Sequence, residues 1–100
     1  MFGYIDVRER SVNSRTVYME IYGGNKVSYR VTSGQMMRYG SESKTYGVEI
    51  EDHNSGGTAS IMDFSADIED AVDFAELLVS EQCMPPQLYA MALKYLYISI

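Results

Sequence analysis

The last sixteen residues of the chain, 85–100, most constrain how it can fold. Eleven of these positions are apolar or tyrosine, and Lys94 is the only charged residue among them. Two prolines open the segment, and proline suits the first turn of a helix because that turn needs no donated N–H. The sequence therefore predicts a helix from about Pro86 onward whose apolar surface must be covered.

The apolar residues of this helix form two adjacent stripes at helical spacing. We expect the first to pack on the rest of the domain; it contains Leu88, Met91, Ala92 and Tyr95. A monomer would expose the second, and contiguous apolar patches above a few hundred Å² are uncommon on monomeric proteins. We therefore predict self-association, most simply as a homodimer, through Tyr89, Leu93, Leu96, Tyr97 and Ile100.

A second way to cover this stripe lies within one chain. Residues 33–43 are punctuated by Gly34 and Gly40, which predicts a loop or a short edge strand. Between the glycines lie Met36, Met37 and Tyr39. If this segment folded over the final helix, no partner would be needed.

The first 64 residues alternate between apolar and polar positions as strands do. In 2–8 and 44–51 the alternation predicts single strands, and 16–22 and 26–32 predict a hairpin. A three-residue loop of Gly23, Gly24 and Asn25 puts the apolar residues of both hairpin strands on one face by pairing Ile21 with Val27. A second hairpin, with His53 to Gly56 as its loop, pairs Ile50 with Ala59 and Val48 with Ile61.

The outer face of the first hairpin carries aromatic and basic residues. The predicted register sets Tyr18 opposite Arg30 and Tyr22 opposite Lys26, which would allow cross-strand cation–π contacts. These four residues are a candidate secondary interaction face on which bases of a single-stranded nucleic acid would stack. The alternative, which we favour, is a solvated sheet face stabilised by these pairs.

After Phe64 the apolar period changes from two to 3.6, which predicts an amphipathic helix over about 66–81. Its polar side is acidic, and Ser65 or Asp67 can cap its N-terminus. A calcium site in this acidic cluster would need the glycine and terminal glutamate of an EF-hand loop, which the sequence lacks. The whole chain is thus predicted to be one α+β domain, an antiparallel sheet of about five strands in 1–64 followed by two helices packed on one face in 65–100.

The segment from Tyr46 to Ile50, the acidic helix after Ser65 and the start of the last helix from Pro85 to Leu88 resemble a family of small bacterial proteins known only as a domain of unknown function. The likeness covers roughly the C-terminal half. The doubled proline and the tyrosine-rich end depart from what we expect of that family. The resemblance implies a bacterial origin and a fold, and it says nothing about catalysis.

The distribution of charge and the absence of known motifs limit the classes of function that we expect for this chain. Residues 1–50 carry seven Lys/Arg and five Asp/Glu, whereas 51–100 carry one and nine, so the −6 net charge sits in the second half. We find no catalytic constellation, nucleotide-binding loop or Cys/His metal spacing, and no basic leader or membrane span. We expect a cytoplasmic, noncatalytic self-associating protein without a cofactor. Two alternatives stay open: an acidic protein that binds a basic macromolecular surface, as a nucleic-acid mimic or inhibitor, and a single-strand binder.

Overall fold

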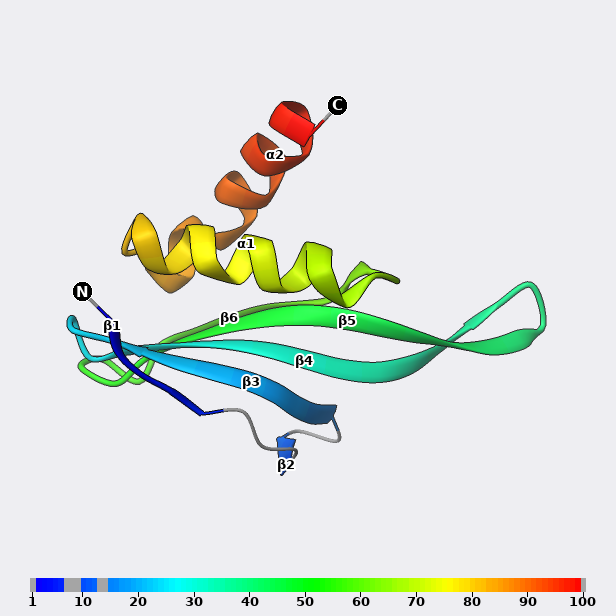
Figure 1. Cartoon of the computed structure of the whole chain (residues 1–100), viewed down its shortest axis with the longest axis horizontal. Coiled ribbons are helices and arrows are strands. Elements are labelled where there is room, and N and C mark those ends of the chain that lie inside the picture. Colours follow the sequence, from blue (N-terminus) through cyan, green and yellow to red (C-terminus); the bar gives the residue numbers. More distant parts are fainter. Residues whose placement is uncertain (1, 7–9, 13–14, 100) are drawn as a thin grey trace.

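Antiparallel strands followed by helices make up the chain in a computed structural model that describes residues 2–6, 10–12 and 15–99 (Figure 1). The strands of these residues are β1 (Phe2–Asp6), β2 (Arg10–Val12), β3 (Arg15–Gly23), β4 (Val27–Arg38), β5 (Ser41–Asp52) and β6 (Thr58–Ser65). The helices are α1 (Ile68–Ser80) and α2 (Leu88–Ser99), with a single 3₁₀ turn, η1 (Pro85–Gln87), directly before α2.

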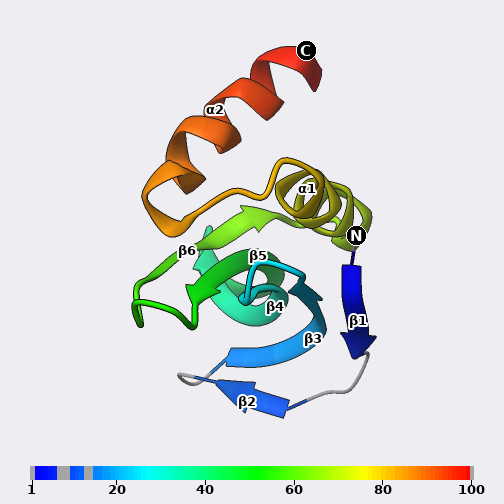
Figure 2. The ribbon, with the colours of Figure 1, turned by 90° about the vertical axis from the view of Figure 1, so that its left-hand side faces the viewer.

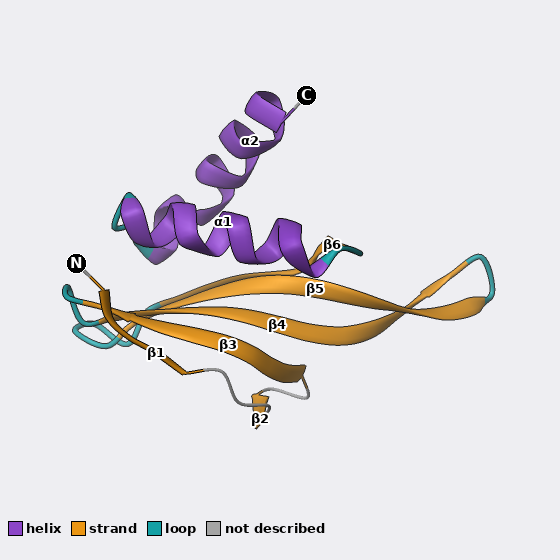
Figure 3. Cartoon of the chain, in the orientation of Figure 1, coloured by secondary structure: helices purple, strands orange, loops and turns teal. Residues whose placement is uncertain are grey.

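All the strands in these ranges belong to one sheet of order β1-β3-β4-β5-β6, with β2 paired to β3 alone. Four long strands, β3 to β6, carry the sheet, and the short strands β1 and β2 add to its N-terminal edge. The helices form a separate layer on one side (Figure 3). The predicted α+β fold is confirmed. The sequence assigned 9–15 to a loop because it is polar, and the structure places β2 inside that segment.

The core lies between the sheet and α1, which lies over the curled sheet (Figure 2). Strands β3, β4 and β5 contribute alternate residues to it, and α1 contributes Phe74, Ala75 and Leu78. Asp67 caps α1 by accepting a hydrogen bond from the backbone N–H of Glu69 at 2.9 Å. The Tyr29 hydroxyl donates to the carbonyl of Cys83 at 2.9 Å and thereby ties the sheet to the segment between the helices.

The predicted register of the first hairpin is wrong by two residues. Ile21 pairs with Tyr29 and Met19 with Val31, so the loop is Gly24-Asn25-Lys26. Lys26 donates its backbone N–H to the carbonyl of Gly23 at 3.2 Å and has a φ of 62°, whereas Gly24 is not among the described residues with positive φ. A shift of two residues in the pairing leaves every side chain on the same face of the sheet, because side chains alternate along a strand with period two. The apolar pattern therefore fits both registers.

The second hairpin is confirmed in its register. Ile50 pairs with Ala59 and Val48 with Ile61, which leaves His53 to Gly56 as the loop. Gly56 has a φ of 80°, a conformation that glycine adopts without steric cost. The carboxylate of Asp52 holds the loop by accepting hydrogen bonds from the backbone N–H of Asn54 at 2.9 Å and from the Ser55 hydroxyl at 3.0 Å.

Residues 33–43 do not fold over the last helix. β4 and β5 pair continuously from Val27 and Asp52 to Arg38 and Ser41. Within the described residues, β3 pairs with β4 only as far as Ser33, and β6 pairs with β5 only as far as Tyr46. The outer part of the hairpin therefore extends beyond the sheet as an arm (Figure 1). Gly34 lies inside a strand, and the turn is made by Tyr39 and Gly40, both with positive φ.

α2 begins where the sequence predicts it, directly after the two prolines. Its first turns lie against β6 and α1, and its C-terminal half projects from the body of the domain (Figures 1 and 2). A membrane-spanning helix needs about 20 apolar residues. None of the helices in the described ranges combines that length with sufficient apolar character.

Candidate interaction surface

The second apolar stripe of α2 faces solvent. Tyr89 and Leu93 are each 61% exposed, and Leu96 is 49% exposed. Their spacing of four and three residues places them on one side of the helix. Of the predicted self-association residues, Ile100 and the side chain of Tyr97 lie outside what the structure describes. The three described members form a continuous line along a projecting helix.

The opposite side of α2 anchors the helix to the domain. Leu88 and Ala92 are buried, and the ring of Tyr95 lies 5.1 Å from that of Phe74 and 5.9 Å from that of Phe64. The rings of Phe64 and Phe74 stack in parallel at 4.6 Å. This aromatic group fixes the helix orientation. The exposed stripe is therefore presented in a defined direction.

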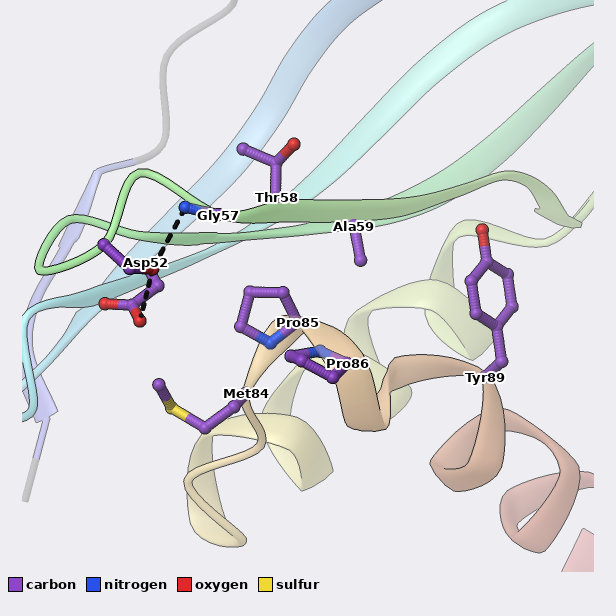
Figure 4. A pocket seen from close by; sticks show the side chains of 9 residues that line it. Asp52, Gly57, Thr58, Ala59, Met84, Pro85, Pro86 and Tyr89 are labelled. Atoms are coloured by element: carbon purple, nitrogen blue, oxygen red, sulfur yellow. Dashed lines mark hydrogen bonds between the residues drawn. The ribbon is translucent and has the colours of Figure 1, made fainter.

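A cavity of about 510 Å³ opens beside the N-terminal end of the stripe (Figure 4). It lies between the β5–β6 hairpin and the start of α2, and its walls include Ala59, Met84, Pro86 and Tyr89. The hydroxyl of Tyr89 donates to the carbonyl of Ser60 at 2.9 Å, which places the aromatic ring across one side of the cavity. The lining is mainly apolar.

The charge around this surface differs from the rest of the second half of the chain. Residues 82–100 contain no carboxylate side chain and one cation, Lys94. The carboxylates of α1 lie on another surface, where Glu69, Asp70, Asp73 and Glu76 are all exposed. The molecule therefore separates an uncharged apolar surface from an acidic one.

The predicted aromatic and basic face of the sheet is not assembled as expected. Arg30 pairs with Glu20 and Tyr22 with Ser28, so the predicted pairs of Tyr18 with Arg30 and Tyr22 with Lys26 are wrong. Tyr18, Tyr22 and Lys26 are exposed, but Arg30 is buried. The two-residue shift in register moved Arg30 away from the tyrosine and placed a glutamate opposite it.

Arg30 binds three carboxylates on neighbouring strands. Its nitrogens lie 2.6 Å from Glu20 Oε2, 2.8 Å from Glu49 Oε1 and 2.5 Å from Glu51 Oε1. Burial disfavours the charge of the guanidinium, but the hydrogen bonds to these glutamates outweigh it and raise the pKa of Arg30. The hydrogen bond from Arg30 in turn lowers the pKa of Glu51. Arg30 is thus fully engaged within the sheet and does not face a nucleic acid.

Other reactive side chains are placed in structural contacts. His53 Nε2 lies 2.7 Å from the Ser28 hydroxyl, and the His53 ring lies 6.0 Å from that of Tyr22. Cys83 is buried, and burial raises the pKa of its thiol. Among residues 2–6, 10–12 and 15–99, no group of three or more His, Cys, Asp or Glu side chains is arranged to hold a metal ion.

Sequence reasoning missed the cavity and the Arg30 network. The cavity depends on how η1 (Pro85–Gln87) meets the part of the β5–β6 hairpin that ends at Ala59, and no local pattern predicts a contact between segments so far apart in the chain. The network had a signal, because Glu20, Arg30, Glu49 and Glu51 all occupy outward positions of adjacent strands. The correct register was needed to bring them together.

A family model described as a family of unknown function, DUF6514, matches residues 8–96. The match extends well beyond the C-terminal half in which the sequence resemblance was found. Comparisons with curated proteins and with solved structures found no match.

Proposed function

We propose that this chain, which belongs to the DUF6514 family, is a noncatalytic interaction domain that forms a homodimer through the exposed stripe of α2. The observation that carries the proposal is the line of Tyr89, Leu93 and Leu96 on a projecting helix, each about half exposed or more. Apolar residues of this size in one continuous line are typical of protein interfaces. Tyrosine suits such a site because its ring packs while its hydroxyl stays hydrogen-bonded.

A second copy of the same chain is the partner that this surface fits. The chain carries a net charge of −6, so two copies repel wherever their acidic surfaces meet. The exposed side of α2 lies in a segment without carboxylates, and it offers a place where two copies can approach without that repulsion. A two-fold pairing needs only one self-complementary patch.

The acidic side of α1 supports a second candidate function, binding to a basic macromolecular surface. Its exposed carboxylates occur along one helix and could face the cations of such a partner. Complexes held in this way weaken as salt rises, because screening reduces the attraction between exposed charges. A salt-resistant homodimer together with salt-sensitive capture of a basic protein would mean that the chain uses both surfaces.

Light scattering coupled to size-exclusion chromatography tests the homodimer. We expect the wild-type chain at micromolar concentration to have twice the mass of one protomer, and Leu93→Glu to have the protomer mass because it places a charge in the centre of the interface. Met37→Glu is the matched control, since Met37 is 64% exposed on the arm of β4 and β5. A monomeric wild-type chain, or dissociation by Met37→Glu and not by Leu93→Glu, would refute the proposal.

A further inference from the structure

The apolar cavity beside Tyr89 is continuous with the proposed dimer surface. Pro86 and Tyr89 line the cavity, and they occupy the same side of the chain as Leu93 and Leu96, at spacings of three, four and three residues. Pro86, Tyr89, Leu93 and Leu96 are all exposed. A molecule that covers the stripe therefore also contacts Tyr89, which lines the cavity.

The chemistry of the cavity favours an apolar side chain. Among the residues that line the cavity, Asp52 alone has a carboxylate side chain. That carboxylate already accepts hydrogen bonds from the backbone and side-chain nitrogens of Asn54 and from the Ser55 hydroxyl. The other walls include the Cβ of Ala59, the thioether of Met84, the two proline rings and the ring of Tyr89, together with the hydroxyl residues Ser55 and Thr58 of the hairpin. No wall supplies an unpaired charge for an ionic ligand.

Helix geometry identifies which residue of a second copy reaches this place. Along a helix with a rise of about 1.5 Å per residue, Tyr89 lies about 6 Å before Leu93 and Leu96 about 4.5 Å after it. In an antiparallel two-fold pair centred near Leu93, the start of each stripe meets the end of the other. Leu96 of one copy then lies beside Tyr89 of its partner.

We propose that Leu96 of each copy inserts into the cavity of the partner, between Tyr89 and the β5–β6 hairpin. This inference rests on the proposed homodimer. It specifies that the two helices pair in antiparallel orientation and that Leu96 is the side chain that anchors them. Each cavity is then closed only in the dimer, and the two-fold symmetry makes the same contact occur twice, once in each copy. The helix itself brings no carboxylate side chain to the contact, because residues 82–100 contain no Asp or Glu, and the Asp52 carboxylate of the cavity is held by Asn54 and Ser55.

A double-mutant cycle on the full chain tests the insertion, with dimer dissociation constants measured by sedimentation. Leu96→Ala removes the inserted side chain and Ala59→Leu fills the cavity. Each should weaken dimerisation about fivefold or more, as loss of a buried anchor costs upwards of 1 kcal/mol. If the two effects were independent, the loss of affinity in the double variant would be the product of the two single losses. We expect the loss in the double variant to be at least threefold smaller than this product, because both substitutions remove the same contact. Independent effects that multiply would overturn the insertion.

Two further measurements keep the outcomes distinct. Ala59→Leu is checked for folding in the monomeric Leu93→Glu background, where its circular dichroism should be unchanged. If it fails to fold, disulfide formation replaces the cycle, in a Cys83→Ala background. Mixed Tyr89→Cys and Leu96→Cys copies should cross-link to each other, whereas Leu96→Cys copies alone should not. A wild-type monomer refutes the dimer itself, and a dimer without this cross-link refutes only the insertion.

Discussion

Gly47 is a residue at which the sheet leaves no room for a side chain. It lies at an irregularity in the pairing of β5 with β6, between Tyr46 and Val48. A Cβ added there would lie 2.6 Å from the carbonyl oxygen of Met62 and closer still to that of Ile61. Backbone atoms of a paired strand cannot move aside without breaking the sheet. Alternation in the sequence places Gly47 on the outward side of its strand, and no local pattern there indicates the close approach of β6.

We expect Gly47→Ala to lower the free energy of unfolding by about 1–3 kcal/mol, the usual cost of forcing extra volume into a packed site. The measurement is urea unfolding at pH 7. Gly57→Ala is the matched control, because a Cβ there would meet only the flexible Ser55 hydroxyl at 3.3 Å. Equal losses in the two variants would show that the close approach at Gly47 is not the cause.

At the scale of elements, the Arg30 network joins three strands. Arg30 is on β4, Glu20 is on β3, and Glu49 and Glu51 are on β5. Removing Arg30 would leave the buried carboxylate of Glu20 near two others without that cation, which costs more than the ion pair itself stabilises. The network therefore fixes the mutual register of these strands, a role that the apolar pattern cannot perform.

This network makes stability depend on pH in the acid range. Arg30 lowers the pKa of Glu51 in the folded state below its ordinary value of 4.5. The ion pair therefore stabilises fully above about pH 4.5, and the stabilisation is lost as pH falls through the folded pKa. We expect the free energy of unfolding to fall as the pH drops below about 5, and to fall less steeply in Glu51→Gln. Identical acid profiles would contradict this assignment.

At the scale of the whole molecule, charge and apolar surface are kept apart. The acidic residues of the second half lie before residue 82, and the apolar side of α2 follows them. With this arrangement two copies repel each other at their acidic surfaces, whereas Tyr89, Leu93 and Leu96 of the exposed stripe carry no charge. The arm of β4 and β5 and the projecting α2 leave the body at different places (Figure 1).

Dimerisation has a thermodynamic consequence for the whole chain. We expect the melting temperature to rise by about 3 °C for each tenfold increase in protein concentration above the dissociation constant. A tenfold rise in protein concentration stabilises the dimer by about 1.4 kcal/mol per mole of dimer. Dividing this by an unfolding entropy of about 2.1 cal/mol/K for each residue of both copies gives the shift. Leu93→Glu should melt at a temperature independent of concentration. Calorimetry across a hundredfold range checks this, and a constant wild-type melting temperature would count against the dimer.

Local pattern by itself determined the class of the fold and much of the exposed stripe. Alternation with period two identified β1, β3, β6 and the inner parts of β4 and β5, the change to period 3.6 identified α1, and two prolines marked the approach to α2. The two stripes of α2 also followed from spacing alone, and the structure exposes Tyr89, Leu93 and Leu96 as expected. Each of these features depends on residues that are close together in the chain. A single sequence was therefore enough to predict them.

Tertiary structure decided what depends on contacts between distant segments. The apolar pattern permitted two hairpin registers that differ by two residues, and the pairing of Glu20 with Arg30 belongs to only one of them. It gave no means to tell whether 33–43 would fold over α2 or extend as an arm. The cavity beside Tyr89 exists because η1 packs beside the β5–β6 hairpin. Such choices rest on long-range packing energies, which no local periodicity contains.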